Sequence, residues 1–87
     1  MPIEMQDPKV LLEHMVMMLV DRPEAVVVDA HIGEATATFE IHVDDSDVGK
    51  VLGRHGAYAD AFRLLFGAAY SKLGKRLQLQ VIEPRRR

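Results

Sequence analysis

Apolar and polar residues recur with two different periods along the chain, and each change of period marks the boundary of an expected element. Apolar residues follow helical spacing from residue 8 to about residue 20, after Asp7-Pro8, which is typical of a helix start. The sequence over 21–23, which ends in a proline, stops this helix. A β-branched run over 25–28 predicts a first strand, and strict alternation over 35–43 predicts a second strand with one buried face.

The second half of the chain predicts two helices and a third strand. The acidic run over 44–47 is typical of a helix N-terminus, because carboxylates cap the free N–H groups there. We expect a short helix cut off by Gly53, a loop over 53–56, and a long helix over about 57–73 with Gly74 beyond its end. Alternation over 77–81 predicts the last strand. The sequence therefore predicts an α+β domain, a three-stranded sheet packed against helices.

The long helix is apolar over much more of its circumference than packing on one sheet requires. At 100° per residue the apolar arc covers roughly 240°, against the stripe of about 100° that a surface helix needs. The two apolar faces are Phe62, Phe66, Ala69 and Leu73 and, on the other side, Ala57, Ala61, Leu64, Leu65 and Ala68. The second face is covered either by the first helix or by a second copy of the chain. We favour a symmetric dimer with an interface at Ala61, Leu64, Leu65 and Ala68.

The composition is ordinary, but the charge is unevenly distributed. A chain of 87 residues, 48% hydrophobic and 28% charged, is typical of one small globular domain over 1–87, with an expected core over 8–83 and a basic tail over 84–87. Residues 1–47 carry two basic and eleven acidic side chains, whereas residues 48–87 carry nine basic and two acidic ones. This asymmetry indicates either an anionic partner for the basic half or a folded dipole without a partner.

Several classes of function find no support in the sequence. There is no cysteine, and the four histidines do not have the spacing of zinc ligands. The acidic run over 44–47 lacks the glycine and distal glutamate of a calcium loop. No nucleophile or acid–base pair is evident, so we predict no enzyme, no cofactor and no metal site. No apolar stretch approaches the roughly 20 residues that span a bilayer, so we expect no membrane association and a cytoplasmic location.

The strongest local signal is the glycine pair Gly53 and Gly56, which brackets Arg54 and His55. Glycine permits a positive φ and a close approach of the backbone to a ligand. The helix that follows offers free N–H groups at its N-terminus, which bind phosphate well, and Lys50 and Arg54 add positive charge. Two glycines three residues apart are common by chance. Their place between two helices, after two strands and before a third, makes the signal much more specific.

The run over 46–56, together with the segments 21–24 and 74–79, resembles the KhpA (YlqC-type) family of small bacterial KH proteins over about residues 8–83. The resemblance implies the type II KH fold (αββααβ), with a three-stranded mixed sheet and a GxxG loop between the second and third helices. It also implies binding of single-stranded RNA, an RNA-chaperone role, and partnership with a larger multidomain KH protein. In the family this pair is tied to cell-wall and cell-shape control.

By position, the resemblance assigns a site for about four nucleotides. The predicted RNA-binding residues are Lys50, Val51, Leu52, Gly53, Arg54, His55, Gly56, Ala59 and Ile41. The loop would clamp the sugar–phosphate backbone, Val51, Leu52 and Ala59 would form the floor of a groove, and Ile41 its far wall.

Two positions depart from the family pattern. Ala57 and Asp60 stand where the family usually has basic residues, which should weaken RNA binding. An alternative therefore stays open, in which the chain is a protein-interaction domain that acts through its long helix and no longer binds RNA by itself.

Overall fold

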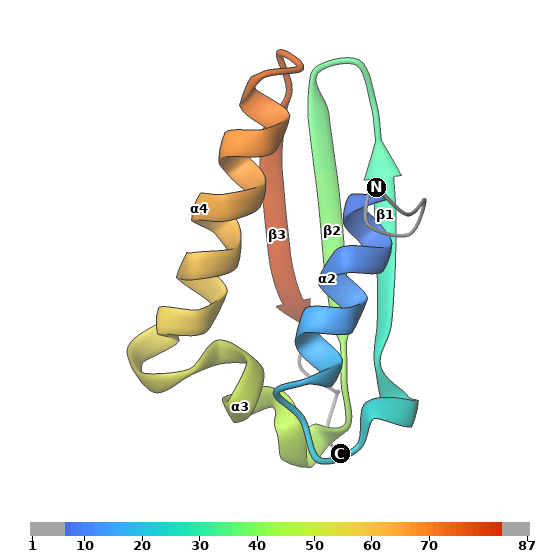
Figure 1. The fold of residues 1–87 in the computed structure, drawn as a ribbon, viewed down its shortest axis with the longest axis vertical. Coiled ribbons are helices and arrows are strands. Elements are labelled where there is room, and N and C mark those ends of the chain that lie inside the picture. The colour runs from blue at the N-terminus through green and yellow to red at the C-terminus, as the bar shows by residue number, and fades with distance from the viewer. Residues whose placement is uncertain (1–6, 83–87) are drawn as a thin grey trace.

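A three-stranded sheet with helices on one of its faces makes up residues 7–82, which are the residues that the computed structural model describes (Figure 1). The elements are α2 (Pro8–Met17), η1 (Pro23–Ala25), β1 (Val27–Ile32), β2 (Thr36–His42), η2 (Asp45–Asp47), α3 (Val48–Leu52), η3 (Arg54–Gly56), α4 (Ala57–Ser71) and β3 (Arg76–Ile82), where η marks a single 3₁₀ turn. This order confirms the predicted αββααβ succession. The predicted basic tail over 84–87 lies outside the described residues.

The sheet is mixed and β2 is its central strand. β1 pairs antiparallel with β2, with Val28 opposite Ile41, and β2 pairs parallel with β3, with Phe39 opposite Leu79. A parallel pair needs a long crossover connection, which α3 and α4 supply here. Alternation in β2 is as predicted, because its inward residues Ala37, Phe39 and Ile41 are all buried.

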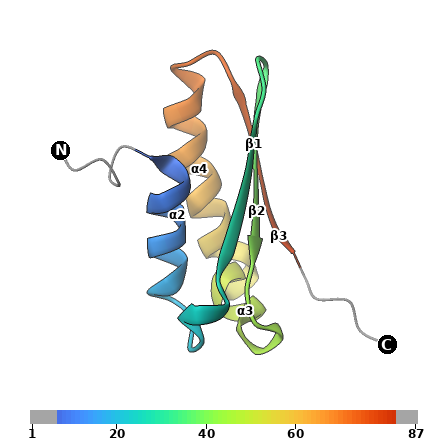
Figure 2. The same ribbon diagram turned by 90° about the vertical axis from the view of Figure 1, so that its right-hand side faces the viewer.

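Both long helices lie on the same side of the sheet, which Figure 2 shows nearly edge-on. α2 contributes Leu12 and Val16 to the core, and α4 contributes Phe66 and Tyr70, whose rings lie 6.4 Å and 5.7 Å from that of Phe39. No helix within residues 7–82 covers the opposite face of the sheet (Figure 2). None of the helices in this range is both long and apolar enough to cross a bilayer.

The ends of the first two elements differ from the prediction. α2 ends at Met17, and Met18 is 83% exposed, so the helix is shorter than its apolar spacing suggests. The first strand covers Val27–Ile32 rather than 25–28, because Pro23 begins a 3₁₀ turn that includes Ala25. Pairing with β2, rather than local propensity, then extends the strand to Ile32.

The buried stripe of α4 is also rotated from the predicted one. It consists of Ala59, Phe62, Phe66 and Tyr70, whereas Ala69 and Leu73 are exposed. The sequence pattern did not distinguish between these two stripes, since the apolar arc is much wider than either of them. Packing against the sheet selected the stripe that carries three aromatic rings.

Candidate nucleic-acid interface

The connection between α3 and α4 is a tight loop that runs through the left-handed region of backbone space. Gly53, His55 and Gly56 have φ values of 75°, 56° and 77°. A Cβ atom at position 53 would lie 2.6 Å from Tyr58 Cγ and 2.8 Å from the Tyr58 backbone nitrogen, so only glycine fits there. At Gly56 a Cβ would meet no atom within 4 Å, and only its φ favours glycine. Both glycines thus have the positive φ that the sequence suggested.

The loop presents one guanidinium group and one imidazole to the solvent. The side chains of Arg54 and His55 are exposed, and neither forms an ion pair within residues 7–82. Gly56 is the N-cap of α4 and offers no side-chain acceptor to the first N–H groups of that 15-residue helix. Free N–H groups at a helix N-terminus, with the positive end of the helix dipole, suit a phosphate or carboxylate.

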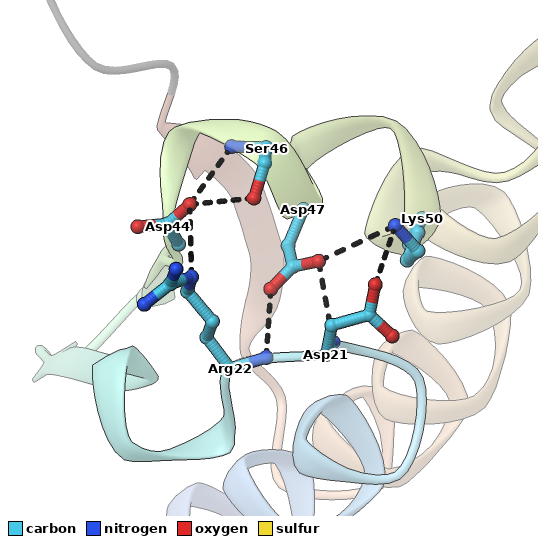
Figure 3. Close-up of polar contacts among 6 residues, drawn as sticks. All are labelled: Asp21, Arg22, Asp44, Ser46, Asp47 and Lys50. Atoms are coloured by element: carbon cyan, nitrogen blue, oxygen red, sulfur yellow. Dashed lines mark hydrogen bonds and ion pairs between the residues drawn. The ribbon is translucent and has the colours of Figure 1, made fainter.

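The other end of α3 is fixed by a buried carboxylate. Asp47 is fully buried, and its two oxygens accept hydrogen bonds from the backbone N–H groups of Asp21 (3.2 Å) and Arg22 (3.0 Å) (Figure 3). Burial alone would raise the pKa of the Asp47 carboxyl. The two N–H donors and the nearby Lys50 ammonium outweigh it and hold the pKa below its ordinary value. Asp47 therefore ties the start of α3 to the segment that follows α2.

This arrangement corrects part of the prediction for the acidic run. Asp44 does cap, because its carboxylate accepts from the Ser46 N–H at 3.0 Å and from the Ser46 hydroxyl at 2.6 Å, and these bonds lower its pKa. Asp47 stands at the N-cap position of α3, but its side chain accepts no hydrogen bond from the N–H groups of that helix. A buried carboxylate needs donors, and the N–H groups of Asp21 and Arg22 supply them.

Lys50 takes part in the same cluster (Figure 3). Its ammonium lies 3.1 Å from the Asp21 carboxylate and 3.5 Å from that of Asp47. The hydrogen bond and charge of Asp21 raise the pKa of Lys50, which keeps the ammonium charged. Its positive charge is nevertheless balanced by two carboxylates, unlike that of Arg54 in the loop.

The outward face of α4 is apolar and uncovered within the described residues. Leu64 and Leu65 are 75% and 59% exposed, and Ala61 and Ala68 are exposed beside them. The alternative that the first helix covers this face is wrong, because α2 packs through Leu12 and Val16 into the core between the helices and the sheet.

Comparison with known proteins assigns the chain to a family. The sequence model of the family described as "KhpA/KhpB, KH domain" matches residues 9–81. This chain belongs to that family. It is 40% identical to the RNA-binding protein KhpA of Borreliella burgdorferi over 84% of this chain and 89% of that protein. It is 39% identical to the RNA-binding protein KhpA of Halalkalibacterium halodurans over 86% of this chain and 99% of that protein.

A solved structure agrees with the fold of this family member. The crystal structure of a variant of Era from Aquifex aeolicus, bound to GDP and aluminium fluoride, superimposes with a TM-score of 0.60 and 16% sequence identity. The match covers 95% of this chain and 33% of that chain, and at this identity it supports the fold alone. The type II KH fold predicted from the sequence is therefore confirmed.

The residues expected to line the KH groove divide into two layers. Ile41, Val51 and Ala59 are at most 1% exposed and lie beneath the surface, Ile41 on the central strand. Leu52 is partly buried against the core. The surface layer consists of Lys50, Gly53, Arg54, His55 and Gly56. A ligand of this surface would therefore touch the surface layer directly, and not the three buried side chains.

The two residues expected to depart from the family pattern, Ala57 and Asp60, both lie on the first turn of α4. Ala57 is exposed and adds no charge. The Asp60 carboxylate accepts a hydrogen bond from Arg63 Nη1 at 3.0 Å, and Arg63 Nε donates to the Leu79 carbonyl at 3.1 Å. The negative charge at position 60 is therefore partly offset by its neighbour one turn away.

Tyr58, which sequence reasoning missed, also stands at this surface. It is the second residue of α4, its side chain is 49% exposed, and it lies against Gly53. A signal was present in the sequence, since an aromatic residue stands two positions after the second loop glycine, in the first turn expected for the following helix.

Strand pairing also gathers one group of possible metal ligands on the open face of the sheet. Oxygen or nitrogen atoms of Asp29, Glu40 and His42 lie within 4.8 Å of one another, and Asp29 Oδ2 is 3.3 Å from His42 Nε2. These side chains are exposed or half-buried, and clusters of exposed acidic groups are common without a bound metal ion. A shallow apolar pocket of about 210 Å³ lies at the other end of α4 from the loop, lined by Pro8, Ala69, Tyr70 and Leu73.

Proposed function

We propose that this protein binds single-stranded RNA through the loop over 53–56 and the start of α4. One observation carries the proposal: a glycine-bracketed loop with exposed Arg54 and His55 leads directly into the N-terminus of a long helix that has no side-chain cap. These groups suit the phosphates of a nucleic-acid backbone. Relatives that match most of the chain are named RNA-binding proteins, which supports the same reading.

The roles of the other predicted residues follow from their burial. Leu52 flanks the loop and is partly buried, whereas Val51, Ala59 and Ile41 are buried and would support the site from within the domain. Lys50 contributes less than Arg54, because a phosphate would compete with Asp21 and Asp47 for its ammonium. Since phosphate contacts dominate, affinity falls as salt rises.

A titration of fluorescent single-stranded RNA, at low and at physiological salt, tests this proposal. Arg54→Asp with His55→Asp should abolish binding, because two carboxylates would face the phosphates. Lys9→Asp with His14→Asp makes the same change of charge on α2, where both residues are exposed, and should leave binding nearly unchanged. Unaltered binding in a folded loop variant would show that the loop is not the site.

We infer further that the exposed face of α4 is an interface. Leu64 and Leu65, with Ala61 and Ala68, form an apolar strip on one helix that suits a symmetric homodimer. The same strip suits a heteromer with a larger multidomain KH protein. Leu65→Glu should give a monomer in light scattering, whereas Met18→Glu, at an exposed methionine after α2, should leave the mass unaltered. A dimer that survives Leu65→Glu would place the interface elsewhere.

A second candidate function is a protein-interaction domain without RNA binding of its own. Three observations favour it, namely the uncharged Ala57, the acidic Asp60 and the balanced charge of Lys50. A protein that forms the dimer but binds no RNA even at low salt would support this candidate over the first.

The wider role that the family resemblance implies is part of the proposal. We place the protein in the cytoplasm as an RNA chaperone that takes part in cell-wall and cell-shape control. The rate at which two complementary RNA strands anneal, with and without the protein, tests the chaperone role, and an unchanged rate would count against it.

A further inference from the structure

Tyr58 differs in position from every other aromatic residue of this chain. The five aromatic residues all lie within the described range, and the other four, Phe39, Phe62, Phe66 and Tyr70, are at most 7% exposed. Tyr58 is 49% exposed. The core therefore uses four rings for packing, and one ring is left at the surface.

This exposed ring is fixed beside the loop. The virtual Cβ at Gly53 lies 2.6 Å from Tyr58 Cγ and 2.9 Å from Tyr58 Cδ2, which puts the ring directly against the glycine backbone. Tyr58 is also the second residue of α4, so its backbone is helical and held in place. An aromatic ring held in this way loses little conformational freedom when a ligand binds to it.

We propose that Tyr58 binds a nucleobase of the RNA by stacking, an inference that rests on the proposed function of the loop. A nucleotide whose phosphate sits at the loop carries its base to one side, and Tyr58 stands next to the first loop residue. The hydrogen-bond donors of Arg54 and His55 suit the phosphates, whereas the ring of Tyr58 suits the flat face of a base. The site thus combines a phosphate contact with a base contact.

The chemistry of stacking defines what this contact selects. Every base has an aromatic face, so Tyr58 should bind purines and pyrimidines alike and add affinity without a strong sequence preference. It should also distinguish a strand that has bases from a sugar–phosphate backbone that has none.

A comparison of two probes tests the inference. One probe is fluorescent oligouridine, and the other is an abasic oligonucleotide of the same length and charge. Tyr58→Leu should weaken binding of oligouridine about tenfold or more, while Tyr58→Phe keeps the ring and should bind nearly as the unaltered protein does. Binding of the abasic probe should be the same in all three proteins.

The outcomes separate this inference from the proposed function. If the unaltered protein binds neither probe, the proposed function itself fails. If it binds both and Tyr58→Leu has no effect, or weakens both probes equally, Tyr58 does not contact a base. Tyr58→Leu could also weaken RNA binding by disrupting a dimer formed through the outward face of α4. The mass of each variant is therefore measured by light scattering. A Tyr58→Leu variant that becomes a monomer would make Tyr58 an interface residue and overturn the proposal.

Intrinsic fluorescence gives a direct second readout. The chain has no tryptophan and two tyrosines, so Tyr70→Phe leaves Tyr58 as the only strong fluorophore. Stacking on a base should quench this emission when oligouridine is added, and the abasic probe should leave it unchanged. Equal quenching by both probes, or none by either at saturation, would contradict stacking.

Discussion

The two ends of the short helix α3 differ sharply. At its start, Asp47 is fully buried with both oxygens hydrogen-bonded, whereas at its end the loop over 53–56 exposes Arg54 and His55. A helix of five residues has little stability of its own. Burial of Val48 and Val51, together with the Asp47 contacts, must therefore hold it. We call the start of α3 at Asp47 the closed end and the loop over 53–56 the open end. The comparison shows that a well-packed closed end can hold the open end in position.

The same contrast separates the two basic residues of α3 and the loop. Lys50 and Arg54 are four residues apart, yet the ammonium of Lys50 faces two carboxylates, and Arg54 has no ion pair among residues 7–82. Equal formal charges therefore serve different purposes. Lys50 mainly balances the buried end, and Arg54 is free to bind an anion.

The largest expected effect comes from removal of the closed end. Asp47→Ala leaves the backbone N–H groups of Asp21 and Arg22 without acceptors, so the melting temperature should fall by about 10 °C at pH 7. The pKa of Asp47 is depressed in the folded protein, so its contribution is complete above the unfolded value of about 3.9 and is lost as pH falls through the folded pKa. The difference between the two proteins should therefore shrink below about pH 4.

Thermal unfolding from pH 7 to pH 2.5 measures both parts of this prediction. Glu24→Gln, which alters an exposed carboxylate in η1, is the control and should change little. A difference between wild type and Asp47→Ala that stays constant down to the lowest pH would contradict a role for the ionised carboxylate.

A smaller effect is expected from the glycines of the open end, and it should differ between them. Gly56→Ala has only the strain of a left-handed backbone, about 1–2 kcal/mol. Gly53→Ala adds a clash with the backbone nitrogen of Tyr58, which no side-chain rotation can relieve, so its free energy of unfolding should fall further. Urea unfolding of both variants checks this order, and equal losses would show that the loop shifts to accept the new atom.

The smallest effect should separate the two basic residues. Arg54→Gln should weaken RNA binding several-fold and lower the salt dependence by about one phosphate contact, with stability unchanged. Lys50→Gln should change RNA binding less and stability more, because it breaks ion pairs with Asp21 and Asp47. Salt titrations of RNA affinity and melting curves of both variants test this prediction. If Lys50→Gln weakens RNA binding as much as Arg54→Gln does, a phosphate must displace the carboxylates from the Lys50 ammonium.

Local chemistry alone was enough to predict the order of the elements and the backbone conformation of the two loop glycines. Asp7 caps α2 by accepting from the Lys9 N–H, β2 alternates, and Gly53, Gly56 and Gly74 all have positive φ, as their neighbours along the chain suggested. Each of these features depends on residues within a few positions, where hydrogen bonding, side-chain periodicity and backbone sterics act directly.

Only the tertiary structure decided the features that join distant segments. Asp47 accepts hydrogen bonds from the N–H groups of Asp21 and Arg22, which lie 26 and 25 positions earlier in the chain. The Tyr58 ring packs against Gly53, and cross-strand pairing brings Asp29 beside Glu40 and His42. Packing likewise chose which stripe of the nearly all-apolar α4 to bury. The physical reason is the same in each case, because such contacts depend on how the elements pack together, which the local pattern of the sequence does not specify.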